Sequence, residues 1–187
     1  MTPRPASTVV LVRETADDIE TLLLLRNTAL AFNGGYWVFP GGKIDQEDYP
    51  TPDAPEYEAA RRAVVRETRE EAGIEIPAGE LIHIAHWTTP PGQSRRYSTW
   101  FFVCPLRASP QIVVDDSEIL DYRWLSPRLA LQAQDEGQLK LPLPTIATLK
   151  TLQHYRNLQD MDIALRSIDV HVFPVDSEFY IPPLTRP

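Results

Sequence analysis

The chain has 187 residues, of which 43% are hydrophobic and 24% charged, and this composition is that of an ordinary folded globular protein. Its net charge of -8 argues against broad electrostatic binding of nucleic acid. A single cysteine, Cys104, excludes an internal disulfide and a cysteine-cluster metal site. No apolar stretch approaches the roughly 20 residues of a membrane span, and the run 9–12 is too short for a signal-peptide core. We therefore expect a cytoplasmic protein without a membrane partner.

Two strands are predicted near the N-terminus, over residues 8–13 and 19–26. The second has a nearly continuous apolar centre, which predicts burial on both faces and a sheet covered on each side. Arg26 ends this strand and is either a surface charge or a residue that faces a substrate phosphate. Residues 27–35 are predicted to be a loop.

A strand that runs into a glycine turn is predicted over residues 37–45. Its two adjacent glycines allow the backbone to approach a ligand or a metal closely. Residues 46–55 are acidic and contain proline, which predicts a surface loop. Asp53 and Glu56 form the pattern of a capping box at a helix start, and the helix is predicted to end at Gly73.

Three carboxylates share one face of this predicted helix, because Glu67, Glu70 and Glu71 stand at positions i, i+3 and i+4. Their mutual repulsion costs a few tenths of a kcal/mol for each close pair. A bound cation would offset that repulsion, and Mg2+ is commonly held by a few carboxylates together with substrate phosphates. The alternative is a solvated acidic face.

The next two strands are predicted over residues 81–88 and from Arg95 onward. His83 and His86 fall on opposite faces of a regular strand and so cannot share a metal, and we interpret them as structural or surface residues. Arg95 and Arg96 either contact substrate phosphates, which guanidinium groups bind well, or balance nearby acidic residues.

An acidic loop over residues 113–120 leads into the last predicted strand of the core, residues 121–125. Helices are then predicted over residues 128–134, 146–157 and 159–167, and the proline-rich residues 171–187 are expected to be extended. We therefore predict one domain over residues 1–187, with a core at about 8–152 and a C-terminal extension at about 153–187.

The acidic helix resembles the Nudix box, whose pattern is G-x5-E-x7-R-E-U-x-E-E-x-G-U, where U is a bulky aliphatic residue. Thr68 stands where the pattern has an aliphatic residue. Fifteen residues separate Gly42 from Glu58, the match to the first glutamate of the pattern, where the pattern itself has five. The ten additional residues are interpreted as a surface-loop insertion. The matching positions are Glu58, Arg66, Glu67, Glu70, Glu71, Gly73 and Ile74.

This resemblance implies a Nudix fold, an α/β/α sandwich with a central mixed β-sheet, and a diphosphate hydrolase that uses Mg2+ or Mn2+. It implies that Glu67 and Glu71 are the principal metal ligands, with Glu70 binding directly or through water. The carbonyl of Gly42 would complete the metal shell. It further implies that Arg66 orients the glutamates by salt bridges, and that Glu58 assists at the other end of the helix.

Members of the family often place a further carboxylate on the loop before the last core strand, as a metal ligand or general base. Glu118 is the residue that we assign to this role, with Asp115 and Asp116 as rivals and a solvated acidic loop as the alternative. The predicted catalytic residues are thus Arg66, Glu67, Glu70 and Glu118, and the predicted substrate-binding residues are Arg26, Arg95 and Arg96.

The insertion and the run W-x-T-P…R-R-Y-x-T-x-F-F are similar to one branch of this family, the acyl-CoA diphosphatases. The resemblance covers residues 8–152, but Ser98 and Trp100 stand where the branch commonly has aspartate and arginine, at positions that could face a ligand. CoA or acyl-CoA is the first substrate expected. ADP-ribose, NADH, nucleotide sugars and oxidised nucleotides remain alternatives, as do a non-catalytic ligand-sensing module and a homodimer whose neighbour completes the pocket.

Overall fold

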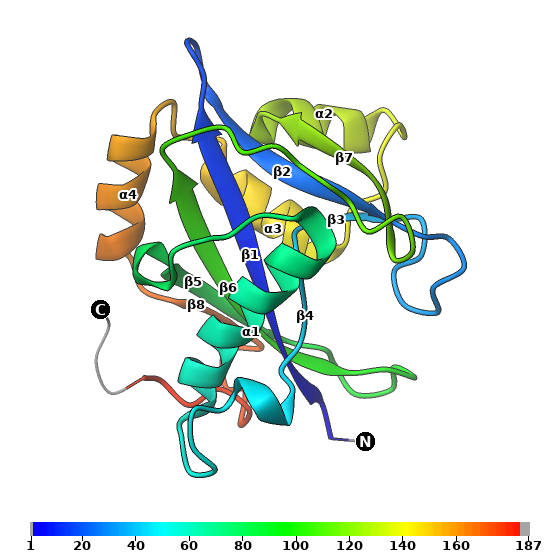
Figure 1. Cartoon of the computed structure of the whole chain (residues 1–187), viewed down its shortest axis with the longest axis vertical. Coiled ribbons are helices and arrows are strands. Elements are labelled where there is room, and N and C mark those ends of the chain that lie inside the picture. Colours follow the sequence, from blue (N-terminus) through cyan, green and yellow to red (C-terminus); the bar gives the residue numbers. More distant parts are fainter. Residues whose placement is uncertain (1, 184–187) are drawn as a thin grey trace.

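A computed structural model describes residues 2–183, whose strands form one mixed eight-stranded sheet (Figure 1). The hydrogen-bonded order is β3-β2-β1-β6-β5-β8, with β4 paired to β1 and β7 paired to β2. The strands are β1 (Arg4–Glu14), β2 (Ile19–Arg26), β3 (Trp37–Val38), β4 (Gly41–Lys43), β5 (Ile82–Thr88), β6 (Tyr97–Leu106), β7 (Ile119–Leu125) and β8 (His171–Phe173). The helices are α1 (Glu56–Ala72), α2 (Pro127–Asp135), α3 (Leu143–Leu152) and α4 (Leu158–Ser167), with 3-10 turns at Gln46–Asp48 and Ala78–Glu80.

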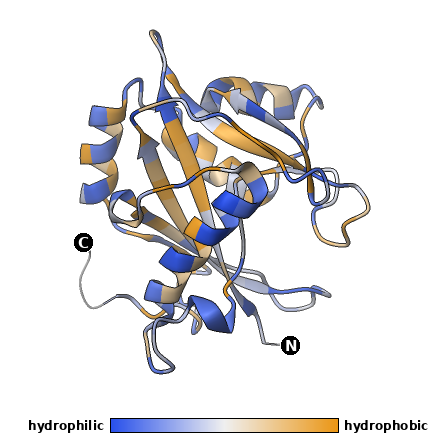
Figure 2. Ribbon diagram, in the orientation of Figure 1, coloured by the Kyte–Doolittle hydropathy of each residue, from blue (hydrophilic) through white to orange (hydrophobic). Residues whose placement is uncertain are grey.

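Both faces of the sheet are covered, as the apolar centre of β2 predicts. Leu22 and Leu24 lie in the cluster that includes the alanines of α1, whereas Ile19 and Leu23 lie in the cluster that includes residues of α2, α3 and α4. Figure 2 shows the apolar strands between the helical layers. The predicted α/β/α sandwich around a mixed sheet is therefore confirmed.

Helix α1 lies close to β1 because its inner side is made of small residues. Ala59, Ala60 and Ala63 are fully buried, and the hydroxyl of Ser7 on β1 donates a hydrogen bond of 2.7 Å to the carbonyl oxygen of Ala60. The helix ends at Gly73, which adopts a left-handed conformation with φ of 69°, as predicted.

The predicted capping box at Asp53 is wrong. The N-cap residue is Pro55, which has no side-chain cap, because the residue before a proline is disfavoured from the helical conformation and the helix therefore starts after it. Glu56 has a different partner, since its carboxylate accepts a hydrogen bond of 2.8 Å from the indole nitrogen of Trp100.

The C-terminal part of the chain packs on the same sheet. Met161 and Leu165 of α4 are fully buried, and β8 extends the sheet by pairing in parallel with β5. Helix α3 starts earlier than predicted because proline is tolerated in a first turn. It ends at Leu152 and not at the predicted Asn157. Asn157 instead caps α4, where its side chain accepts a hydrogen bond from the N–H of Asp160. Residues 184–187, part of the segment expected to be extended, lie outside the described residues.

The prediction that His83 and His86 lie on opposite faces is wrong. The pairing of β5 with β6 shifts between His83 and Ala85, and such a bulge changes the alternation of side chains. Both histidines are buried, and their rings lie 5.1 and 5.0 Å from the ring of Trp100. Cys104 is fully buried.

Among residues 2–183, no helix combines the length and the apolar character needed to cross a membrane.

Candidate active site

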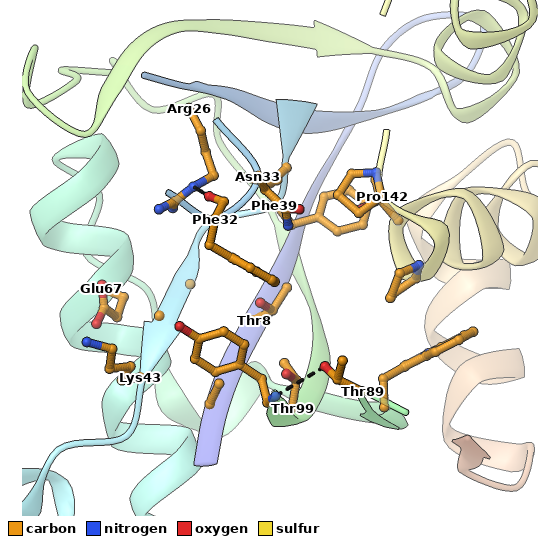
Figure 3. A pocket seen from close by; sticks show the side chains of 18 of the residues that line it. Thr8, Arg26, Phe32, Asn33, Phe39, Lys43, Glu67, Thr89, Thr99 and Pro142 are labelled. Atoms are coloured by element: carbon orange, nitrogen blue, oxygen red, sulfur yellow. Dashed lines mark hydrogen bonds between the residues drawn. The ribbon is translucent and has the colours of Figure 1, made fainter. Parts of the chain in front are cut away.

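A pocket of about 790 Å³ extends from the C-terminal half of α1 across the strand β4 to the start of α3. Figure 3 shows Glu67 and Lys43 on one side of this pocket, Arg26 at another edge, and Phe39 and Pro142 across from them. The pocket thus joins an acidic end to an end lined by aromatic and apolar side chains.

Glu71 is buried at the acidic end and is held by the glycine turn. The backbone N–H of Gly41 donates a hydrogen bond of 2.9 Å to its Oε2. Burial raises the pKa of the Glu71 carboxyl to about 8, although the Gly41 hydrogen bond opposes this shift and the nearby Glu67 carboxylate adds to it. A buried carboxylate with this pKa lacks a full counter-charge, which a cation could supply.

Gly42 faces the carboxylate of Glu67 at close range. A Cβ atom added at Gly42 would overlap all three atoms of that carboxyl group, so the absence of a side chain creates the space that Glu67 occupies. Burial also raises the pKa of Glu67, while its hydrogen bond to Arg66 lowers it.

Arg66 is fixed by a two-pronged pair with Asp48. Its Nε and Nη2 atoms donate to the two carboxylate oxygens of Asp48, at 3.1 and 2.8 Å, and Nη2 also donates to the carbonyl of Lys43 at 3.1 Å. The remaining nitrogen, Nη1, donates to Glu67 at 2.9 Å and to the exposed Glu70 at 3.3 Å. The hydrogen bonding that Arg66 donates to Asp48 is the main cause that raises the pKa of Arg66, whereas the partial burial of Arg66 opposes the shift.

Arg26 lies between two carboxylates at the pocket edge. Its guanidinium nitrogens are 3.7 Å from Glu71 Oε1 and 3.9 Å from Glu118 Oε2, and its Nε donates to the carbonyl of Phe32 at 3.3 Å. Arg26 and Glu118 both line the pocket. Both charges therefore face the pocket and lie close to an opposite charge.

The rivals of Glu118, Asp115 and Asp116, do not line the pocket. Asp115 closes its own loop by accepting hydrogen bonds from the hydroxyl of Ser117 and from the N–H groups of Glu118 and Ile119. Burial acts to raise the pKa of Asp115, but these hydrogen bonds outweigh it and the pKa is lowered. Neither Asp115 nor Asp116 lines the pocket, whereas Glu118 does, with a side chain that is 60% exposed.

The model for the family described as NUDIX domain matches residues 2–144. The chain belongs to the Nudix family. It is 26% identical over 189 residues to the putative nudix hydrolase 7 of Caenorhabditis elegans, and the matched region covers 82% of this chain and 62% of that protein. It is 34% identical over 77 residues to the human acyl-coenzyme A diphosphatase NUDT19, covering 40% of this chain and 20% of that protein.

Among solved structures, a NUDIX hydrolase from Alicyclobacillus acidocaldarius is similar, with a TM-score of 0.77 and 25% sequence identity over 91% of this chain and 98% of that one. In the sequence comparisons, by contrast, the chain spans less than two thirds of the length of either relative. The predicted Nudix membership is confirmed, and a relative named as an acyl-CoA diphosphatase supports the predicted branch.

Within the Nudix box, the sequence matches Glu58 to the first acidic position of the pattern, but the structure places Glu58 far from Arg66. Glu58 is exposed in the first turn of α1 and lies eight residues from Arg66, which is about 12 Å along the helix axis. Asp48 instead accepts two hydrogen bonds from Arg66. The predicted surface loop therefore contains a buried carboxylate.

A signal for Asp48 was present in the sequence. Five residues separate Gly42 from Asp48, which is the spacing of the box between its first glycine and its first acidic residue. The insertion accordingly lies between Asp48 and Arg66 rather than between Gly42 and Glu58. The match of Asp48 to the pattern is easily missed, because aspartate stands where the pattern has glutamate.

The predicted substrate arginines are separated by the fold. Arg95 lines the pocket, whereas Arg96 is directed elsewhere, since its Nε donates to the carbonyl of Thr89 at 2.9 Å and its guanidinium lies 5.8 Å from the ring of Phe179. Ser98 and Trp100 also face away from the pocket. The alternation of β6 directs Tyr97, Thr99 and Phe101 into it instead.

The donor set at the acidic end suits a hard divalent cation, because it consists of carboxylate and carbonyl oxygens. A Cβ at Gly42 would overlap the carboxylate of Glu67. The missing side chain therefore leaves space beside the backbone for that carboxylate. Within the described residues, no three His, Cys, Asp or Glu side chains are already gathered around one point. Glu67 is engaged by Arg66 and Glu71 by the N–H of Gly41.

Proposed function

We propose that this protein is a metal-dependent diphosphatase that hydrolyses a nucleoside diphosphate linked to a further moiety. The observation that carries the proposal is the buried Glu71 beside Glu67 at the Gly41–Gly42 turn, in a pocket that also contains Arg26 and has room for a ligand of this size.

Glu67 and Glu71 would hold Mg2+ or Mn2+, with Glu70 and the carbonyl of Gly42 as further ligands. When bound, such an ion neutralises charge that develops on the phosphate and lowers the pKa of water. Arg66, fixed by Asp48 and the carbonyl of Lys43, keeps the carboxylate of Glu67 in place. Arg26 offsets the negative charge of Glu71 and Glu118 at the pocket edge.

Glu118 is the candidate general base. It is the acidic residue of the 113–120 loop that lines the pocket, and its carboxylate reaches Arg26 but is mostly exposed. A general base must come within hydrogen-bond distance of the attacking water, and an exposed side chain on a loop is free to do so. Glu118→Gln should lower kcat with little change in KM, and an unaltered kcat would remove Glu118 from this role.

CoA or acyl-CoA is the proposed substrate. A named acyl-CoA diphosphatase among the relatives supports this choice, and the aromatic and apolar end of the pocket suits a substrate that carries more than sugar beyond its diphosphate. ADP-ribose, NADH, nucleotide sugars and oxidised nucleotides form the test panel. Turnover of ADP-ribose with none of CoA would contradict the CoA assignment.

The test of the activity is product analysis over this panel with Mg2+ and with Mn2+, for the wild type and for Glu71→Gln. This substitution should abolish metal-dependent turnover, because it removes a buried metal ligand without changing its shape. A non-catalytic ligand-sensing module would instead bind a member of the panel without turnover. The expected location is cytoplasmic, and localisation by microscopy checks it.

A further inference from the structure

The pocket has two ends of different chemistry, and the C-terminal part of the chain contributes a residue to the second end. Phe173 of β8 lines the pocket, and β8 lies beyond residue 144, where the match to the family model ends. The backbone pairing places Phe173 beside Trp87 of β5, and their ring centroids are 4.6 Å apart with an angle of 33° between the planes. The C-terminal extension therefore supplies part of a ligand-facing wall.

This wall is uncharged. The pocket-lining residues that β5, β8 and α3 contribute within the described chain are Trp87, Thr88, Phe173, Leu143, Pro144 and Thr145. Leu143 is 64% exposed although it is a large apolar residue. Covering an apolar wall of this kind favours binding of the ligand. The affinity rises by up to a factor of about four for each methylene group removed from water.

Two of the hydroxyl groups near the wall are hydrogen-bonded within the protein. The hydroxyl of Thr88 is hydrogen-bonded to that of Ser177 at 2.8 Å, and the hydroxyl of the neighbouring Thr89 accepts from the N–H of Tyr97 at 3.1 Å. A nucleobase needs partners for its ring nitrogens and its amino group, and each of these two hydroxyls already uses part of its hydrogen-bonding capacity within the protein. The wall suits a hydrocarbon better than a base.

We propose that Trp87, Phe173 and Leu143 form a distal apolar subsite that receives the hydrocarbon part of the substrate, at the opposite end of the pocket from the glutamates. The subsite makes the C-terminal extension a determinant of specificity. The inference rests on the proposed diphosphatase function and assigns the far end of the same pocket to an apolar chain, such as the acyl group of a thioester.

The test compares the wild type with Phe173→Ala on octanoyl-CoA, CoA and ADP-ribose, measured as kcat/KM. The ratio of kcat/KM for octanoyl-CoA to that for CoA should fall about tenfold in Phe173→Ala and only partly in Phe173→Leu. Val172→Ala is the matched control, because Val172 is the preceding residue of β8 and does not line the pocket. In this control the ratio should stay within about twofold of the wild type.

Two outcomes would overturn the distal subsite while leaving the diphosphatase intact. One is an unchanged ratio in Phe173→Ala. The other is an equal loss for all three substrates, which would assign the wall to the shared adenosine diphosphate part or to the stability of β8. Absence of turnover for every substrate would instead contradict the proposed function itself. In that case affinity for octanoyl-CoA and CoA, measured by calorimetry, decides the subsite, and equal affinities would overturn it.

Discussion

The pair between Arg66 and Asp48 gives the sharpest test of how the insertion supports the site. In Asp48→Ala, Arg66 loses its two hydrogen bonds of 3.1 and 2.8 Å to a buried carboxylate. Hydrogen bonds to charged groups contribute about 1.5–3 kcal/mol each. Arg66 retains the Lys43 carbonyl and Glu67 and is one quarter exposed, so we expect a net loss of about 2–3 kcal/mol in the free energy of unfolding.

For a chain of this length such a loss lowers Tm by about 4–12 °C, which differential scanning calorimetry resolves. Activity should fall about 10- to 100-fold, as is typical when a residue that orients a metal ligand is removed. Glu58→Gln is the control and should change stability by less than about 0.5 kcal/mol, because Glu58 is exposed. A silent Asp48→Ala together with a damaging Glu58→Gln would refute this assignment and restore the alignment made from the sequence.

The two glycines of the turn should respond differently to alanine. Gly41→Ala should destabilise the fold by more than about 1 kcal/mol, because a Cβ there meets the backbone of β1 and φ is 153°. Gly42→Ala should lower Tm less than Gly41→Ala does but reduce metal affinity, measured by titration calorimetry, because the Cβ displaces the end of the Glu67 side chain rather than backbone. Burial lowers the pKa of His86 to about 4, so its contribution to stability is complete above its ordinary pKa of 6.5 and is lost as pH falls toward 4. Urea unfolding of the wild type should lose about 2 kcal/mol through His86 between pH 7 and pH 5, a loss that His86→Gln should not show, and equal slopes for both proteins would contradict it.

Local patterns sufficed for most of the fold. The apolar run in β2 predicted burial on both faces, and the helix that ends at Gly73 followed from residues next to each other in the chain. The spacing of Glu67, Glu70 and Glu71 predicted a shared acidic face, because the period of a helix is a local property. These features depend on backbone geometry that each segment imposes by itself.

Other features depended on contacts between distant segments. The bulge in β5 that turns His83 and His86 to one face arises from its pairing with β6, and the direction of Arg96 toward Thr89 rather than the pocket arises from packing. Neither is encoded in a window of a few residues. The helix start was missed for a local reason, since Pro55 outweighs the capping pattern of Asp53.

The sequence by itself determined the family and the acidic helix, because both rest on residue types at fixed spacing. Only the tertiary structure decided which acidic residue holds Arg66, since Asp48 and Arg66 are 18 positions apart and meet through the turn at Gln46–Asp48. It likewise decided that Phe173, 86 positions from Trp87, lines the same pocket. Chain separation hides such contacts, because the pairing of β8 with β5 forms only when the whole sheet is assembled.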